Sequence, residues 1–148
     1  MNKEYFINLV KYPISGKARK YIKQYNELQS ANKIKLIMTL VVRNEEDILE
    51  KNIRFHSAMG VDGFIVVNHK STDKTSDILE KLKNENIVLD VLEKNSLNHQ
   101  HHKWVNEMIK LAQKKYKADW VINADADEFY YSKDLDLKKS IYKYSKAG

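Results

Sequence analysis

The four residues Asp125-Ala126-Asp127-Glu128 are the part of this sequence best suited to chemistry. Alternate residues of an extended segment point the same way, so the carboxylates of Asp125 and Asp127 can lie side by side. Two like charges are costly together unless a cation neutralises them, and carboxylate oxygens suit Mg²⁺ or Mn²⁺. Such an ion commonly completes its shell with water and phosphate oxygens. The motif therefore predicts a metal site for a phosphate-bearing ligand, although a bare Asp-x-Asp also occurs in solvated acidic loops and helix caps.

The elements that must position these carboxylates follow from the apolar pattern. Near-continuous apolar runs are typical of strands covered on both faces, and segments with helical spacing of apolar residues separate them. Strands are predicted at 34–42, 63–68, 87–92 and 120–124, and helices at 44–59, 76–83 and 101–116. This alternation favours an α/β fold with a mostly parallel sheet, right-handed crossovers and helices on both faces.

Residue types near the helix ends indicate how the helices begin and end. Asn44 is predicted to cap the first helix, and Gly60 to end it. The polar residues of 71–75 are predicted to cap the second helix. Apolar residues continue the face of Trp104 along the third helix, so this side chain is expected in the core rather than against a sugar.

The chain is predicted to consist of a leader and one globular domain. Residues 1–32 form the leader, in which Pro13 and Gly16 interrupt an apolar cluster and 18–29 is predicted to be a polar helix. The domain spans 33–148 and ends in a lysine-rich, helical tail after Tyr131. At 148 residues the chain is long enough for a proper hydrophobic core.

Composition narrows the class of protein. No apolar run reaches membrane-spanning length, and the absence of cysteine removes disulfides and thiolate metal sites. The net charge of +6 comes almost wholly from lysine, and aromatics do not interleave with a basic stripe, which argues against nucleic acid as a partner. The charge reflects either a solvated surface or attraction to an anionic partner, a nucleotide diphosphate or a membrane, through segments 17–23 and 138–146.

Polar residues follow three of the predicted strands at the point where each strand ends. In open α/β sheets, ligands bind at the carboxyl ends of the strands. The residues concerned are Arg43, Asn44 and Glu45 after the first strand, Asn68, His69, Lys70 and Ser71 after the second, and Asp125, Asp127 and Glu128 after the fourth. A purely structural domain has no need of this arrangement, so this edge is the predicted ligand site.

Three ordered motifs resemble the family-2-like glycosyltransferases. They are LIMTLVVRNE at 36–45, FIVVNHKSTDKT at 64–75 and WVINADADEF at 120–129, and the last is similar to the branch whose metal motif ends in Asp-Glu-Phe. Asn106 and Ala112 also fall where that family's preceding helix often carries these residues. The resemblance covers about 34–131 and implies the GT-A fold, a Rossmann-like nucleotide-binding domain. Much of the acceptor-binding half of that fold is expected to be missing.

The resemblance implies a role for each matching residue. Asp127 would be the main ligand of Mn²⁺ or Mg²⁺, Asp125 would contact the ribose or a metal-bound water, and Glu128 would support or share the metal. Residues Val42, Arg43, Asn44 and Glu45 would line the base and ribose pocket. Asn68 and His69 stand where the family has base-contacting positions, and the usual aspartate is absent, although an amide oxygen could accept the same hydrogen bond. Lys70 could reach a phosphate.

Two further features of the sequence bear on catalysis. His99, His101 and His102 could contact a donor or acceptor, but their spacing fits no standard zinc pattern. Enzymes of this fold usually take their general base from beyond the metal motif, where only Asp134 and Asp136 follow in this chain. The catalytic base is therefore expected outside this chain.

These expectations combine into a metal-dependent glycosyltransferase. It would move a sugar from a nucleotide-diphosphate donor, expected to be a UDP-sugar, to a hydroxyl of a glycan or lipid-linked acceptor in surface-polysaccharide assembly. The expected location is the cytoplasm, including the inner face of the membrane, with peripheral membrane association; the oligomeric state is left open. A noncatalytic nucleotide-sugar-binding module is the alternative. A phosphatase is disfavoured because its Asp-x-Asp follows the first strand, and an oxidoreductase because no Gly-x-Gly-x-x-Gly is present.

Overall fold

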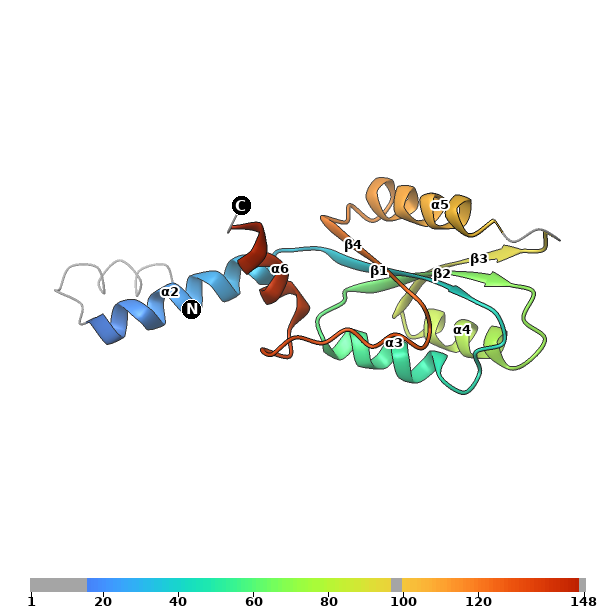
Figure 1. Cartoon of the computed structure of the whole chain (residues 1–148), viewed down its shortest axis with the longest axis horizontal. Helices are drawn as coiled ribbons and strands as arrows, with labels where there is room; N and C mark the ends of the chain where they lie inside the picture. The colour runs from blue at the N-terminus through green and yellow to red at the C-terminus, as the bar shows by residue number, and fades with distance from the viewer. Residues whose placement is uncertain (1–15, 97–99, 147–148) are drawn as a thin grey trace.

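The computed structural model describes residues 16–96 and 100–146, which form an α/β layer with one helical extension (Figure 1). A four-stranded sheet lies between α5 on one face and α3 with α4 on the other (Figure 1). The helices are α2 (Gly16–Asn32), α3 (Leu49–Ala58), α4 (Thr75–Asn84), α5 (His101–Lys114) and α6 (Leu137–Ser145). The predicted fold class, a parallel α/β sheet with helices on both faces, is confirmed.

The sheet is wholly parallel and has the strand order β3-β2-β1-β4. Its strands are β1 (Leu36–Val42), β2 (Gly63–His69), β3 (Val88–Lys94) and β4 (Trp120–Ala124). The chain moves outward from β1 to β3 and then returns to place β4 on the other side of β1. Between β1 and β4 the order reverses, and in doubly wound sheets this switch point is where ligands bind.

The two faces of the sheet bury alternate residues of each strand. The face under α3 and α4 contains Leu36, Met38 and Leu40 of β1, together with Phe64 of β2, all fully buried. The opposite face packs under α5. Its core consists of Ile37, Ile65, Val67, Trp104, Met108 and Ala112. Trp104 is 4% exposed, so the prediction that it belongs to the core is confirmed.

The strand positions agree closely with the sequence prediction, while one helix starts later than expected. β4 has the predicted bounds, and α3 ends near Gly60, which adopts a positive φ of 98°. However, α3 begins only at Leu49, so the prediction that Asn44 caps it is wrong. Asn44 has a φ of 57°, which belongs to a turn, and its side-chain oxygen accepts a hydrogen bond from Thr72 N at 2.8 Å.

The predicted capping of α4 by residues 71–75 is correct only for Asp73. This carboxylate accepts a hydrogen bond from Thr75 N at 3.0 Å, inside the first turn of α4. The residue before the helix is Lys74, and it provides no side-chain cap. Ser71 and Thr75 instead direct their hydroxyls at the loop after β1. Polar turn residues can therefore satisfy a neighbouring loop as readily as their own helix.

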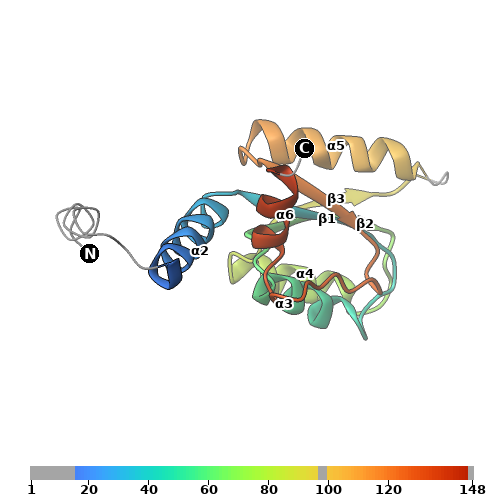
Figure 2. The same ribbon diagram turned by 60° about the vertical axis from the view of Figure 1, so that its left-hand side comes forward.

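The leader and the tail meet at one end of the molecule. Helix α2 projects away from the sheet, and its C-terminal end lies beside α6 in both views (Figures 1 and 2). The chain reaches α6 by passing from β4 beneath the sheet along α3 (Figure 1). Leu137 N donates to Met59 O at 2.9 Å, and Lys138 pairs with Asp62 at 2.6 Å. These contacts fasten the start of α6 to the domain.

Candidate functional site

A cavity of about 360 Å³ lies at the switch point between the C-terminal ends of β1 and β4. We call it the switch-point cavity. It is lined by Val41, Val42, Arg43, Glu45, His69, His101 and Asp125. Four of the predicted donor-site residues after β1 and β4, namely Val42, Arg43, Glu45 and Asp125, thus share one hollow with His69 of β2. The order of the strands explains this meeting, because it makes the ends of β1 and β4 adjacent.

Acidic side chains gather beside this cavity. Burial raises the pKa of Glu45, and the negative charges of Asp127, Asp47, Asp73 and Asp125 raise it further, in that order. The carboxylates of Asp125 and Asp127 accept no hydrogen bond and form no ion pair within residues 16–96 and 100–146. Their charge therefore remains uncompensated within this part of the chain. A bound cation would relieve it.

The carboxylates beside the cavity suit a divalent cation that takes some of its coordinating oxygens from a bound ligand. Among the described residues, no three histidine or acidic side chains converge closely enough to form a ready metal cage. Mg²⁺, however, is often bound through one or two carboxylates together with substrate phosphates and water. Asp125 and Asp127, with Glu45 beside them, provide carboxylate oxygens of that kind. The residues present are thus compatible with an ion that binds together with a diphosphate.

Glu128 has a different set of contacts from those two aspartates. Its carboxylate folds back to accept hydrogen bonds from Asp125 N at 3.1 Å and from the Tyr130 hydroxyl at 2.9 Å. These two bonds lower the pKa of Glu128. In this geometry Glu128 closes the turn that carries Asp125 and Asp127, so it supports the acidic segment by fixing its backbone.

Six hydrogen bonds join the loop after β1 to the loop after β2, five from backbone N–H groups and one from the Thr72 hydroxyl to Asn44 Oδ1 at 3.4 Å. Backbone N–H groups of Asn44, Glu45 and Glu46 donate to Ser71 Oγ at 3.0 Å, Thr75 Oγ1 at 2.9 Å and Asp73 Oδ2 at 3.1 Å. In return, Thr72 N donates to Asn44 Oδ1 and Lys74 N donates to Glu46 Oε2, both at 2.8 Å. We call residues 43–47 and 71–75 the loop pair. It fixes Arg43 and Glu45 at the mouth of the cavity.

The acidic segment, residues 125–130, is held from behind by two buried residues of α3. Asn52 Nδ2 donates to Glu128 O at 2.7 Å, and Tyr130 N donates to His56 Nε2 at 2.9 Å. Since Nε2 accepts, the His56 proton lies on Nδ1, which faces the Asn52 carbonyl and Oδ1, each at 3.0 Å. Both side chains are fully buried, and burial lowers the pKa of His56.

The roles of Asn52 and His56 in holding the acidic segment were not predicted from the sequence. They are four residues apart and lie on the buried side of α3 beside Leu49 and Ile53. Polar residues at helical spacing on an otherwise apolar face were the available signal, because a buried polar group must find a partner. The sequence could not name that partner, which lies 76 residues away for Asn52 and 74 for His56.

The three predicted residues at the end of β2 occupy different environments. His69 lines the cavity, and its ring contacts Trp104 with the centroids 4.8 Å apart. Asn68 is 1% exposed and donates to Ser76 Oγ and Glu93 Oε1, while its Oδ1 is buried without a partner in the described part of the chain. Lys70 has a positive φ of 54° at the following turn. Asn68 and Lys70 do not line the switch-point cavity.

Arg43, which directly follows β1, and His101, at the start of α5, also face this region. Arg43 is exposed at the cavity and forms no ion pair with any described residue. His101, at the start of α5, lines the same cavity, and its ring lies 6.1 Å from that of the exposed His102. The predicted contact of His99 falls outside the described residues. Arg43 thus supplies a positive charge opposite an acidic group of side chains.

The sheet order and the polar residues at its switch point define a Rossmann-like α/β domain. A family model described as glycosyltransferase family 92 matches residues 37–146, more than half of the 148-residue chain. The chain belongs to this family. The prediction of a glycosyltransferase is confirmed at this level, while the family-2-like branch and its Asp-x-Asp-Glu-Phe metal motif stay predictions.

Two solved structures resemble this chain, and the first of them has a similar fold. Residues 1–349 of TarS from S. aureus match with a TM-score of 0.52 and 20% identity, covering 77% of this chain and 32% of that one. At this identity the likeness shows the fold alone, and the present chain spans about a third of that structure. Protein Rv1636 from Mycobacterium tuberculosis H37Rv matches with a TM-score of 0.34 and 15% identity, covering 77% and 91%. That score supports no argument. No curated protein matches the chain.

Proposed function

We propose that the switch-point cavity binds a nucleotide-diphosphate sugar, with a UDP-sugar as the expected donor, together with Mn²⁺ or Mg²⁺. The observation that carries this proposal is the gathering of Asp125, Asp127 and Glu45 beside a cavity at the topological switch point. Membership of glycosyltransferase family 92 indicates the class of reaction, which is transfer of a glycosyl group. The acceptor would be a hydroxyl of a glycan or a lipid-linked glycan.

Each residue at the cavity has a role in this proposal. Asp125 and Asp127 would hold the ion, which when bound would neutralise charge on the departing diphosphate. Arg43, exposed and without an ion pair to a described residue, would contact the same diphosphate. The loop pair would keep Glu45 and Arg43 in place. In the reaction, the acceptor oxygen bonds to the anomeric carbon while the bond from that carbon to the diphosphate breaks, and the hydroxyl proton passes to a base.

A noncatalytic nucleotide-sugar-binding module is the second candidate, and the contacts of two acids favour it. Asp134 forms ion pairs with Lys139 and Lys143, and Asp136 caps α6 by accepting from Lys139 N at 3.1 Å. These are the two aspartates that follow the acidic segment, and both are engaged structurally. We therefore assign neither of them as the base.

The test is thermal unfolding of the chain with UDP, GDP or CDP, each with and without Mn²⁺. A ligand at about 100 times its dissociation constant stabilises a protein by about 2.7 kcal/mol, which raises the Tm of a chain of this size by about 7 °C. We expect that rise with UDP and Mn²⁺ together. Asp127→Asn should abolish the metal-dependent part. Glu80→Gln is the matched control, because Glu80 is an exposed acid on α4.

Three outcomes separate the candidates. Metal-dependent stabilisation that is lost in Asp127→Asn, with release of UDP from a UDP-sugar, supports the transferase. The same stabilisation without UDP release in the presence of hydroxyl acceptors supports the binding module. Absence of stabilisation by all three nucleotides contradicts the donor site in this chain. We place this activity in the cytoplasm, including the inner face of the membrane.

A further inference from the structure

Helix α2 presents basic and aromatic side chains that the rest of the described chain leaves largely uncovered. It contains four basic residues and one acidic residue. Lys17, Arg19 and Lys20 are exposed and form no ion pair with any residue that the structure describes. The fourth, Lys23, lies 4.0 Å from Glu27, so the single acid of the helix is already paired. The first half of α2 is therefore strongly positive.

Aromatic and apolar side chains share a face of the same helix. Tyr21, Tyr25 and Leu28 follow one another at spacings of four and three residues, so they lie on one side, with Lys17 a further turn toward the start. Tyr21 is 61% exposed, and Tyr25 and Leu28 are each 38% exposed. A hollow of about 400 Å³ runs from these three side chains to the lysines of α6. We call Lys17, Lys20, Tyr21, Tyr25 and Leu28 the α2 surface. Arg19 lies on the opposite side of the helix, where it lines a different hollow.

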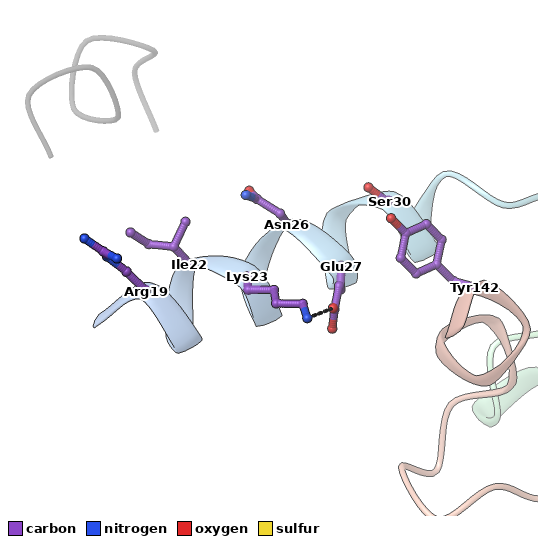
Figure 3. A pocket seen from close by; sticks show the side chains of 7 residues that line it. All are labelled: Arg19, Ile22, Lys23, Asn26, Glu27, Ser30 and Tyr142. Carbon is purple, nitrogen blue, oxygen red and sulfur yellow. Dashed lines mark ion pairs between the residues drawn. The ribbon is translucent and has the colours of Figure 1, made fainter. Parts of the chain in front are cut away.

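The position of α2 leaves this surface accessible. The helix projects beyond the sheet, and only its C-terminal end lies beside α6 (Figures 1 and 2). Figure 3 shows Tyr142 of α6 near Ser30, while Arg19 and Ile22 lie farther out along the helix. A second hollow, of about 520 Å³, separates Tyr142 from this outer part. On α6, Lys138 pairs with Asp62, and Lys139 and Lys143 share Asp134, whereas Lys17 and Lys20 form no ion pair with a described residue.

We propose that the α2 surface docks this protein onto a bilayer that contains anionic phospholipids. Tyrosine and leucine enter the boundary between headgroups and acyl chains, while lysine reaches the lipid phosphates. At 17 residues α2 is about 26 Å long, and no helix in the described part of the chain is long and apolar enough to cross a membrane. The helix therefore lies in the plane of the interface.

A membrane fits these side chains better than nucleic acid does. Nucleic-acid surfaces combine a basic groove with aromatic rings on which bases stack. In α2 the tyrosines share a face with Leu28, and Arg19 is the sole arginine of the helix. One apolar face flanked by lysines is instead the pattern of a helix that lies on a membrane. The interaction does not depend on the donor site, which is at the far end of the sheet from α2 (Figure 1).

Flotation of the full chain with vesicles tests the proposal. Vesicles of phosphatidylcholine alone are compared with vesicles that contain 30% phosphatidylglycerol, a fraction of roughly one lipid in three that gives a strongly negative surface. We expect binding only to the anionic vesicles and its loss in high salt. Each basic residue near such a surface contributes about fivefold, so Lys17→Gln and Lys20→Gln together should weaken partitioning about 25-fold.

Two further variants separate the α2 surface from general charge. Lys83→Gln and Lys110→Gln together change the net charge equally at exposed positions on α4 and α5 and should weaken partitioning less than about threefold. Tyr21→Ser should weaken it about threefold while circular dichroism and Tm stay unchanged. Asp127→Asn should bind vesicles normally, so failure of the donor site and failure of this proposal are distinguishable.

Several results would overturn the proposal. They are no binding to anionic vesicles, equal loss of binding in the two lysine variants, and equal binding to neutral vesicles. Tighter binding of a single-stranded RNA that Lys17→Gln with Lys20→Gln abolishes would reassign the surface to nucleic acid. Concentration-dependent dimerisation that the same variant abolishes would reassign it to a second copy of the chain.

Discussion

The loop pair and the acidic segment both bring acidic residues to the switch-point cavity, but different contacts hold them. The loop pair is joined by five hydrogen bonds between backbone N–H groups and side chains, most of them at exposed positions. The acidic segment is held by Asn52 and His56, which are both fully buried. Exposed bonds compete with water, whereas buried groups that lose a partner stay desolvated. Substitutions that remove the α3 contacts should therefore lower the free energy of unfolding more than substitutions in the loop pair.

The difference also bears on function. The acidic segment follows an edge strand, and apart from its turn at Glu128 its position depends on the contacts with α3. Phe129 adds an edge-to-face contact with Phe55, with the ring centroids 5.2 Å apart. The proposed metal ligands Asp125 and Asp127 thus depend on side chains that never touch the ligand. By contrast, the loop pair has enough separate bonds that each contributes little alone.

His56→Ala is expected to have the largest effect. It removes a fully buried ring and leaves Tyr130 N and Asn52 Oδ1 without their partner, so we expect a loss of about 3 kcal/mol in the free energy of unfolding. Urea denaturation measures this loss. Ser57→Ala, at the next and exposed position of α3, is the control and should change stability by less than about 0.5 kcal/mol. Equally small losses of stability in the two variants would show that the buried contacts of His56 contribute little to the fold.

Asn52→Ala should follow, with a loss of about 2 kcal/mol, because Glu128 O and His56 Nδ1–H each lose a hydrogen bond in a buried setting. The double variant with His56→Ala should lose less than the sum of the single losses, since the two residues share one network. Strict additivity in urea denaturation would contradict that network. The metal-dependent stabilisation by nucleotide should weaken in both single variants.

The sequence predicted the strands and their order along the chain, but not the contacts that fix the site. β4 was predicted to the residue because polar residues bound a short apolar run. Asn44 was misassigned, since an asparagine before acidic residues fits a helix cap and a turn with positive φ equally well. The buried roles of Asn52 and His56 depend on which distant backbone groups reach α3, and local spacing does not contain that information.

Acid should weaken the contacts that His56 makes with the acidic segment. Burial holds the pKa of His56 below its ordinary value of 6.5, so the folded protein favours the neutral ring. The contribution of this ring is complete above pH 6.5 and is lost as the pH falls from there toward the lowered pKa. Urea denaturation of the wild type against His56→Gln measures it, because Gln does not titrate. A constant difference between pH 7.5 and 5.5 would contradict a buried neutral ring.

Ser71→Ala should have the smallest effect. Ser71 Oγ accepts from Asn44 N at 3.0 Å, both residues lie near the surface, and water can replace the lost acceptor. We expect a loss of about 0.5 kcal/mol and little change in nucleotide binding. Thr75→Val is the informative partner, because Thr75 is fully buried and accepts from Glu45 N at 2.9 Å, so its loss should approach about 1 kcal/mol. If Ser71→Ala instead cost as much as Asn52→Ala, the loop pair would be a cooperative anchor like α3, and burial would not explain the difference between them.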